Sequence, residues 1–139
     1  MLRTRVIPVL LLRERALVKT RRFGKFRYIG DPTNTVRIFN ELEVDELCLL
    51  DISAPRARRG PDFDVLRDVA SECFMPLAYG GGISDLETAK RVFDTGFEKV
   101  VVNTAATERP DLIGQVARVY GSQAVVASID VGRDWLGRA

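Results

Sequence analysis

Histidine is absent from the 139-residue sequence, which removes the residue that most often serves as a general base and as a metal ligand. Two cysteines are present, Cys48 in an apolar run and Cys73 on the apolar stripe of an expected helix. Both are typical of small buried hydrophobic residues, so neither a disulfide nor a metal site is expected. Acid–base chemistry would have to use carboxylates, lysine or tyrosine. We predict no metal and no other cofactor.

The sequence also lacks a long apolar run and a strong excess of one charge. No run reaches the roughly 20 residues of a membrane-spanning helix, and the N-terminus has no signal-peptide pattern. These absences predict a cytoplasmic protein without a membrane contact. The net charge of +2 gives nucleic-acid binding no overall support. The length fits one domain over residues 1–139.

The most informative stretch is Met75–Asp85, in which a short apolar run ends in three glycines before a helix begins. Ser84 is expected to cap that helix, with Glu87 completing a capping box. Glycines at such a point let backbone N–H groups approach an anion, usually phosphate, at the positive end of the helix dipole. A tight turn without a ligand is the competing interpretation.

Apolar strands and amphipathic helices alternate along the chain. Strands are expected at 5–12, 46–51, 75–79, 99–103 and 124–130. Helices are expected to begin at Asp31-Pro32, Pro61, Asp85 and Pro110, the first with Val36, Phe39 and Leu42 as its apolar stripe. A short return strand at 16–19 is followed by a polar loop at 20–30, which is either functional or merely solvated. The basic residues of this region are Lys19, Arg21, Arg22, Lys25 and Arg27.

An internal repeat points to one α/β architecture. Asp31 and the segment 37–40 recur 54 positions later as Asp85 and the segment 91–94. Two tandem βαβα units are what half of a (βα)8 TIM barrel would contain. A Rossmann sheet is less favoured because no G-x-G-x-x-G follows the first strand. We predict a truncated half-barrel with a parallel sheet, built from four βα units and a fifth strand, or a chain that completes the barrel with another copy.

Polar residues stand at the C-terminal ends of the predicted strands, where barrels of this kind bind ligands. These ends carry Asp51, the glycine turn, Asn103-Thr104 and Asp130, whereas the first strand ends at Leu11. Asp51 either faces the ligand or caps its own loop. The two carboxylates, the glycines and the amide–hydroxyl pair would share one mouth.

Charged residues open three of the strands at the opposite end of the sheet, namely Arg5, Glu46 and Lys99. In a closed barrel they would ring the bottom of the bore. Such a ring is either a salt-bridged plug or a gate for a small molecule, and in a generic barrel the plug is the default.

Several motifs together resemble one family. They are Gly30-Asp31-Pro32, Asp45-Glu46-Leu47, Gly80-Gly81-Gly82-Ile83, Asn103-Thr104-Ala105-Ala106 and Ile129-Asp130. The sequence resembles the cyclase subunit of imidazole glycerol phosphate synthase over its full length, which is about half of that family's length. The resemblance implies a barrel partnered by a glutaminase, whose ammonia crosses the barrel and reacts with a phosphorylated ribulosyl nucleotide.

The resemblance also implies roles for individual residues. Gly81, Gly82, Asn103 and Thr104 would hold one substrate phosphate, with Asp51 and Lys19, the latter on a mobile loop, as further substrate contacts. Asp130 would be one of two catalytic aspartates, and Arg5, Glu46 and Lys99 would form the ammonia gate.

One departure concerns the other catalytic aspartate of the family, because that position is Leu11 here. Two carboxylates can share the acid and base roles of ring closure, and a carboxylate opposite a leucine cannot. The surrounding segment resembles a paralogous branch associated with surface polysaccharide, which implies ammonia delivery to an amidotransferase that makes an acetamidino sugar. The alternatives are an orthodox cyclase of histidine biosynthesis using Asp130 and Asp51, and an inactive phosphate-binding fragment that could self-associate.

Overall fold

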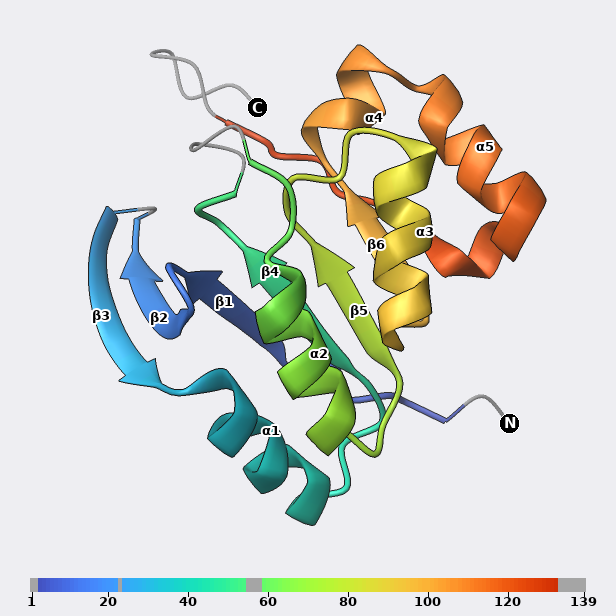
Figure 1. The fold of residues 1–139 in the computed structure, drawn as a ribbon. Coiled ribbons are helices and arrows are strands. Elements are labelled where there is room, and N and C mark those ends of the chain that lie inside the picture. The colour runs from blue at the N-terminus through green and yellow to red at the C-terminus, as the bar shows by residue number, and fades with distance from the viewer. Residues whose placement is uncertain (1–2, 23, 55–58, 133–139) are drawn as a thin grey trace.

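The computed structural model describes residues 3–22, 24–54 and 59–132, and its strands and helices alternate after an initial hairpin (Figure 1). The elements are β1 (Val9–Arg13), β2 (Ala16–Arg21), β3 (Gly24–Gly30), α1 (Pro32–Glu41), β4 (Leu47–Asp51), α2 (Phe63–Glu72), β5 (Leu77–Gly80), α3 (Leu86–Thr95), β6 (Lys99–Val102), α4 (Thr104–Glu108), α5 (Asp111–Tyr120), the 3-10 turn η1 (Ser122–Ala124) and β7 (Val125–Ala127).

One seven-stranded sheet has the order β3-β2-β1-β4-β5-β6-β7. The strands β1, β4, β5, β6 and β7 are parallel and follow each other in chain order, whereas β2 and β3 are antiparallel additions at one edge. A doubly wound sheet would reverse the order of its parallel strands at a switch point, and the parallel strands β1-β4-β5-β6-β7 show no such reversal. The fold is therefore a partial (βα)8 barrel whose sheet is not closed.

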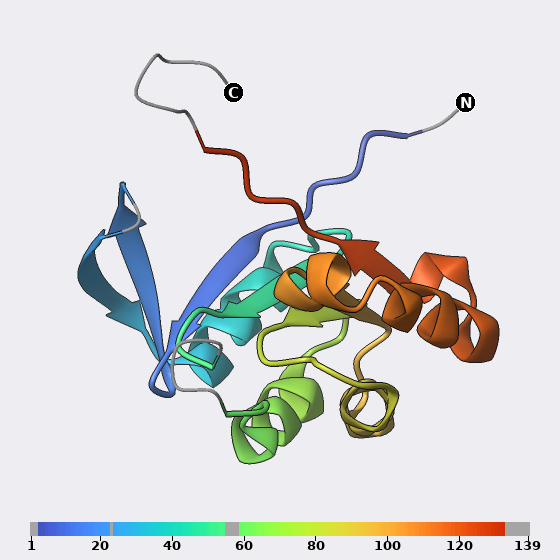
Figure 2. The same ribbon diagram turned by 90° about the horizontal axis from the view of Figure 1, so that it is seen from above.

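The helices cover one face of the sheet and leave the other face open (Figure 2). Strand side chains alternate between these faces, so Leu10 and Leu12 of β1 are buried under the helices while Val9 is 55% exposed on the open side. Fully buried members of the core include Leu12, Leu17, Leu47, Leu49, Leu66, Val92, Val100, Leu112 and Val116. No helix in the described ranges is both long enough and apolar enough to span a bilayer.

The internal repeat has a structural counterpart. Helices α1 and α3 have ten residues each and are offset by the same 54 positions as the repeated motif. Each is capped by the repeated aspartate: Asp31 Oδ2 accepts from Asn34 N at 2.9 Å, and Asp85 Oδ1 accepts from Thr88 N at 2.7 Å. The Thr88 N–H lowers the pKa of Asp85, because this hydrogen bond favours the charged carboxylate.

Two local predictions about helix ends are wrong. Asp85 caps α3 in place of Ser84, whose hydroxyl contacts the Asp85 carboxylate instead. Leu42 is 64% exposed and lies outside the apolar stripe, because α1 ends at Glu41. Both errors are shifts at a helix end, where one residue decides which side chain reaches the free N–H groups or the core.

The polar loop predicted at 20–30 is wrong as well. The return strand extends to Arg21, and Gly24–Gly30 forms β3, so this region is an antiparallel hairpin. Phe26 and Tyr28 are residue types that favour strands, but they alternate with the basic residues Lys25 and Arg27, so the segment reads as polar. β2 pairs with the C-terminal half of β1, so that half of the β1 edge has a hydrogen-bonded neighbour.

Two strands are clearly shorter than the sequence predicts, and one short helix was not predicted. The first strand begins at Val9, because the preceding chain bonds elsewhere: Val6 N donates to Asp45 Oδ2 at 2.7 Å. The fifth strand is limited to Val125–Ala127, and the short helix α4 was not predicted.

Candidate functional site

The glycine turn packs directly against the loop that follows β4. Gly81 and Gly82 have positive φ values of 135° and 66°, which side chains disfavour. A Cβ on Gly81 would lie 2.6 Å from the Asp51 carbonyl oxygen, and one on Gly82 would lie 2.5 Å from the Arg59 carbonyl oxygen. Both glycines are therefore required by backbone conformation and by the neighbouring loop, whether or not a ligand binds.

Asp51 is 3% exposed, and both of its carboxylate oxygens accept hydrogen bonds from residues of the loop that follows it. Oδ1 accepts from Ser53 N at 2.9 Å, from the Ser53 hydroxyl at 2.7 Å and from Ala54 N at 3.0 Å. Oδ2 accepts from Arg59 Nη2 at 3.2 Å. These are the contacts of the loop-cap interpretation, and they hold the β4–α2 loop in place under the glycine turn.

Tyr79 lies beneath the same turn and was not predicted as part of the site. Its ring is fully buried and packs edge-to-face on Phe97, with centroids 5.8 Å apart. Its hydroxyl has no hydrogen-bond partner within the described chain, and a Cβ on Gly81 would lie 3.1 Å from it. Burial raises the pKa of Tyr79, so the phenol is neutral. Only the tertiary packing reveals this unsatisfied group.

Asn103 and Asp130 meet at the C-terminal ends of β6 and β7. Asn103 Nδ2 donates to Asp130 Oδ2 at 3.1 Å, and both residues are exposed. Thr104 follows as the first residue of α4. Arg109 Nη1 donates to the Ser84 carbonyl at 3.0 Å and so ties the segment after α4 to the glycine turn. The structure thus brings the predicted phosphate residues and Asp130 to one rim.

The side chains of Leu11 and Lys19 face opposite sides of the sheet. Leu11 pairs with Leu50 on one side and with Val18 on the other, and its side chain belongs to the open face. Lys19 follows Val18 in β2 and therefore points to the opposite side of the hairpin. No hydrogen bond or ion pair in the described ranges joins Lys19 to the glycine turn or to Asn103.

Arg5, Glu46 and Lys99 form one ion-paired cluster at the opposite ends of the strands. Glu46 is 4% exposed; its Oε1 lies 2.6 Å from Lys99 Nζ and its Oε2 lies 3.4 Å from Arg5 Nη1. Cys48 is the next open-face residue of β4, and burial raises the pKa of its thiol to about 11. The Cys48 thiol directly above the cluster is thus uncharged at neutral pH.

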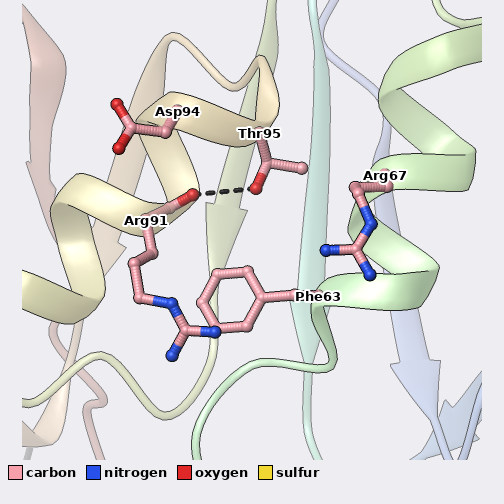
Figure 3. Close-up of a pocket in the computed structure, with 5 residues that line it drawn as sticks. All are labelled: Phe63, Arg67, Arg91, Asp94 and Thr95. Carbon is pink, nitrogen blue, oxygen red and sulfur yellow. Dashed lines mark hydrogen bonds between the residues drawn. The ribbon is translucent and has the colours of Figure 1, made fainter.

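A surface groove of about 360 Å³ lies elsewhere, between α2 and α3 on the helix layer (Figure 3). The Arg91 guanidinium covers the Phe63 ring at 3.9 Å, beside Arg67, Asp94 and Thr95. None of the predicted site residues lines this groove.

A parallel sheet in chain order, with polar residues at the C-terminal strand ends and an ion-paired cluster at the other end, defines the class of the protein: it is part of a (βα)8 barrel. Within that class, the chain belongs to the histidine biosynthesis protein family, whose model matches residues 5–138.

Individual relatives agree with this assignment. The chain is 53% identical over 137 residues to "Putative imidazole glycerol phosphate synthase subunit hisF2" of Pseudomonas aeruginosa, covering 99% of this chain and 55% of the relative. It is 53% identical over 138 residues to a protein of Leptospira borgpetersenii with a similar name, covering 99% and 54%. It is 44% identical over 131 residues to "Imidazole glycerol phosphate synthase subunit HisF" of Dictyoglomus thermophilum, covering 94% and 52%. The chain spans about half the length of the curated relatives it matches.

Proposed function

We propose that this chain is part of a cytoplasmic barrel that receives ammonia from a glutaminase and passes it to an amidotransferase that makes an acetamidino sugar of a surface polysaccharide. The observation that carries the proposal is Leu11. It stands on the open face in the middle of β1, because the strand continues to Arg13 and does not end at Leu11 as predicted. The cyclases that the sequence resembles have a catalytic aspartate at this position. With a leucine there, Asp130 lacks the second carboxylate that imidazole ring closure uses.

The cluster of Arg5, Glu46 and Lys99 supports the ammonia inlet. Glu46 lies between two cations that differ in exposure. Of the Arg5 side chain 62% is accessible, compared with 22% of the Lys99 side chain. A movement of Arg5 alone would leave the Glu46–Lys99 pair in place. The cluster can therefore open on its outer side at a small cost, since Arg5 is mostly exposed and Glu46 keeps its shorter pair with Lys99.

The inner wall above this cluster suits a neutral molecule. On the open face, Cys48, Ala78, Leu50 and Val101 follow the cluster toward the rim, and none carries a charge. Gly80 lies between the last two, where a Cβ would be 2.8 Å from Leu50 Cδ2 and 2.9 Å from Val101 Cβ. Such a wall favours ammonia over ammonium, because an apolar surface disfavours an ion.

The rim supports a phosphorylated ligand in this proposal. Gly81, Gly82, Asn103 and Thr104 would bind its phosphate through backbone and side-chain donors. Asp51 acts indirectly, because both of its oxygens hold the loop against the glycine turn. Asp130 is the rim carboxylate available for proton transfer.

Two alternatives remain distinct from this proposal. An orthodox cyclase would need Asp51 as the second carboxylate, and the enclosure of Asp51 by Ser53, Ala54 and Arg59 argues against that role. A phosphate-binding fragment without catalysis would use the same rim but would bind no glutaminase.

The proposal can be tested by completing the barrel genetically. The chain would be joined to the second half of the Dictyoglomus thermophilum relative and expressed in a histidine auxotroph that lacks its own cyclase subunit. We expect no growth with Leu11 and growth with Leu11→Asp, because the substitution restores the second carboxylate. A third variant that combines Leu11→Asp with Asp130→Asn is the matched control and should not grow.

Growth of the unsubstituted chimaera would refute the proposal and favour the orthodox cyclase. If Leu11→Asp fails to grow although circular dichroism shows a folded protein, Leu11 is not the determinant and the proposal is also wrong. Binding of the purified chimaera to a glutaminase, lost with Arg5→Glu, distinguishes an ammonia-receiving barrel from an inactive fragment.

A further inference from the structure

The hairpin β2–β3 carries a concentrated positive charge that the proposed function does not use. The segment Ala16–Gly30 contains five lysines or arginines and no acidic residue, although the whole chain has a net charge of only +2. Without this segment the chain would be net negative. Lys19, Arg21, Lys25 and Arg27 are all exposed, and none of them has an ion-pair partner in the described ranges.

Two of these cations are placed directly opposite each other. Lys19 pairs with Arg27 in the antiparallel ladder, next to the pair formed by Val18 and Tyr28. Like charges at directly opposed positions of a sheet repel and destabilise the pairing. The hairpin thus tolerates an unfavourable contact that a single neutral substitution would remove.

The cationic pair faces away from the mouth of the barrel. Val18 pairs with Leu11, so the Val18–Tyr28 pair lies on the side of the open face, and the adjacent Lys19–Arg27 pair lies on the other side. The hairpin stands at the edge of the sheet, clear of the helix layer (Figure 2). This surface therefore stays accessible when the open face of the sheet is covered.

We propose that this face of the hairpin, centred on Lys19 and Arg27 with Arg21 and Lys25 near the tip, docks an acidic surface of a partner protein. Its charge is complementary to clustered carboxylates, and complementary charge mainly gives specificity and fast association. A single-stranded nucleic acid fits less well, because the exposed aromatic ring of Tyr28 lies on the opposite face and stacking cannot accompany phosphate contacts. A small phosphate fits less well because the cations lie on an open strand surface and enclose no pocket.

Binding of defined polyanions to the 139-residue chain tests the inference. The probe is a fluorescein-labelled oligoglutamate peptide followed by fluorescence anisotropy, with an oligothymidylate and pyrophosphate as competitors. We expect binding that weakens with salt and weakens about tenfold in Lys19→Glu. The control Arg118→Glu makes the same change of charge at an exposed site on α5 and should bind like the parent chain.

Stability provides a second readout from the same variant. Lys19→Glu replaces a repulsive pair with an attractive one, so its urea midpoint should rise while its affinity falls. Misfolding of the variant would instead lower both the urea midpoint and the affinity.

Three results would overturn the inference. One is no measurable binding of oligoglutamate. Another is an equal loss of binding in Lys19→Glu and Arg118→Glu, which would mean that net charge alone attracts the peptide. The last is tighter binding of oligothymidylate or pyrophosphate, which would assign the surface to nucleic acid or to a small phosphate. The test does not involve Leu11 or the rim, so its failure leaves the proposed function unaffected.

Discussion

Glu46 is a buried carboxylate held between a shielded cation and an exposed one. Its partner Lys99 lies at 2.6 Å with 22% of its side chain accessible, whereas Arg5 lies at 3.4 Å with 62% accessible. Removing the shielded partner leaves the buried carboxylate with only the longer pair to the exposed Arg5. Removing the exposed partner leaves the closer pair intact.

We therefore expect Lys99→Met to lower the free energy of unfolding by about 3 kcal/mol. Arg5→Met, the matched control, should lower it by less than about 1 kcal/mol. Urea unfolding of both variants measures the difference. Equal losses would show that Glu46 does not depend mainly on Lys99.

A substitution at Gly82 tests the packing of the glycine turn in the ligand-free protein. Gly82→Ala places a Cβ 2.5 Å from the Arg59 carbonyl at a φ of 66°, so we expect a loss of about 2 kcal/mol or more. Gly114→Ala is the control, because that helical glycine has no atom within 4 Å of an added Cβ and should gain about 0.5 kcal/mol. Thermal unfolding distinguishes the two, and a tolerated Gly82→Ala would contradict the observed contact.

Asp51 and Tyr79 show which contacts cannot be predicted from the sequence. The spacing of Asp51 and Ser53 allows a loop cap, since aspartate commonly accepts from the backbone two residues on. Nothing local indicates that Arg59, eight positions away, completes the cap, or that the Tyr79 hydroxyl stays unpaired.

At the scale of elements, α3 depends on the cap at its first turn. Asp85→Ala should cost about 1 kcal/mol, because the Thr88 N–H loses its acceptor. Ser84→Ala should change the stability by a few tenths at most, since the Ser84 hydroxyl does not contact the helix N–H groups. Chemical denaturation of the two variants checks the position of the cap, and the reverse order of effects would restore Ser84 as the cap.

The same elements predict how stability depends on pH. The Thr88 N–H lowers the pKa of Asp85. The Arg37 guanidinium of α1 lowers the pKa of Glu72 on α2, and this contact joins the two helices. Carboxyls with a folded pKa below the unfolded value of about 4 stabilise the fold above that value and lose this effect as the pH falls through the folded pKa. The urea midpoint should therefore fall between about pH 5 and pH 3. The variant Asp85→Asn combined with Glu72→Gln should show a shallower fall, and an unchanged profile would argue against these two contacts.

The hairpin shows why one element escaped prediction. Strand propensity in residues 24–30 is divided among alternating basic and aromatic positions, and both sides are exposed. Alternation of apolar and polar residues indicates strands that have one buried face, and neither face of β3 is buried. The ladder with β2 stabilises this strand, and that ladder exists only when the two segments meet.

At the scale of the whole molecule, the open face of the sheet is the largest departure from an ordinary globular surface. Val9 and Val126, on strands at opposite sides of the parallel sheet, are 55% and 40% exposed. Apolar residues gathered on one face favour association. We expect the 139-residue chain to self-associate in a concentration-dependent way, as measured by light scattering after size-exclusion chromatography.

A matched pair of variants locates that contact. Val9→Lys should shift the chain toward the monomer, because it places a charge on the open face. Val119→Lys changes a valine that is 61% exposed on α5 and should leave association unaltered. A monomer at all concentrations would contradict the prediction.

The sequence by itself determined the alternation of strands and helices, the 54-residue repeat, and the polar strand ends, because these depend on spacings within one or two elements. The tertiary structure alone decided that Gly81 and Gly82 accommodate a neighbouring loop, that both oxygens of Asp51 are bonded to that loop, and that Glu46 is buried between Arg5 and Lys99. Those features join segments that lie far apart in the chain, and only the packed sheet brings them within a few ångströms of each other.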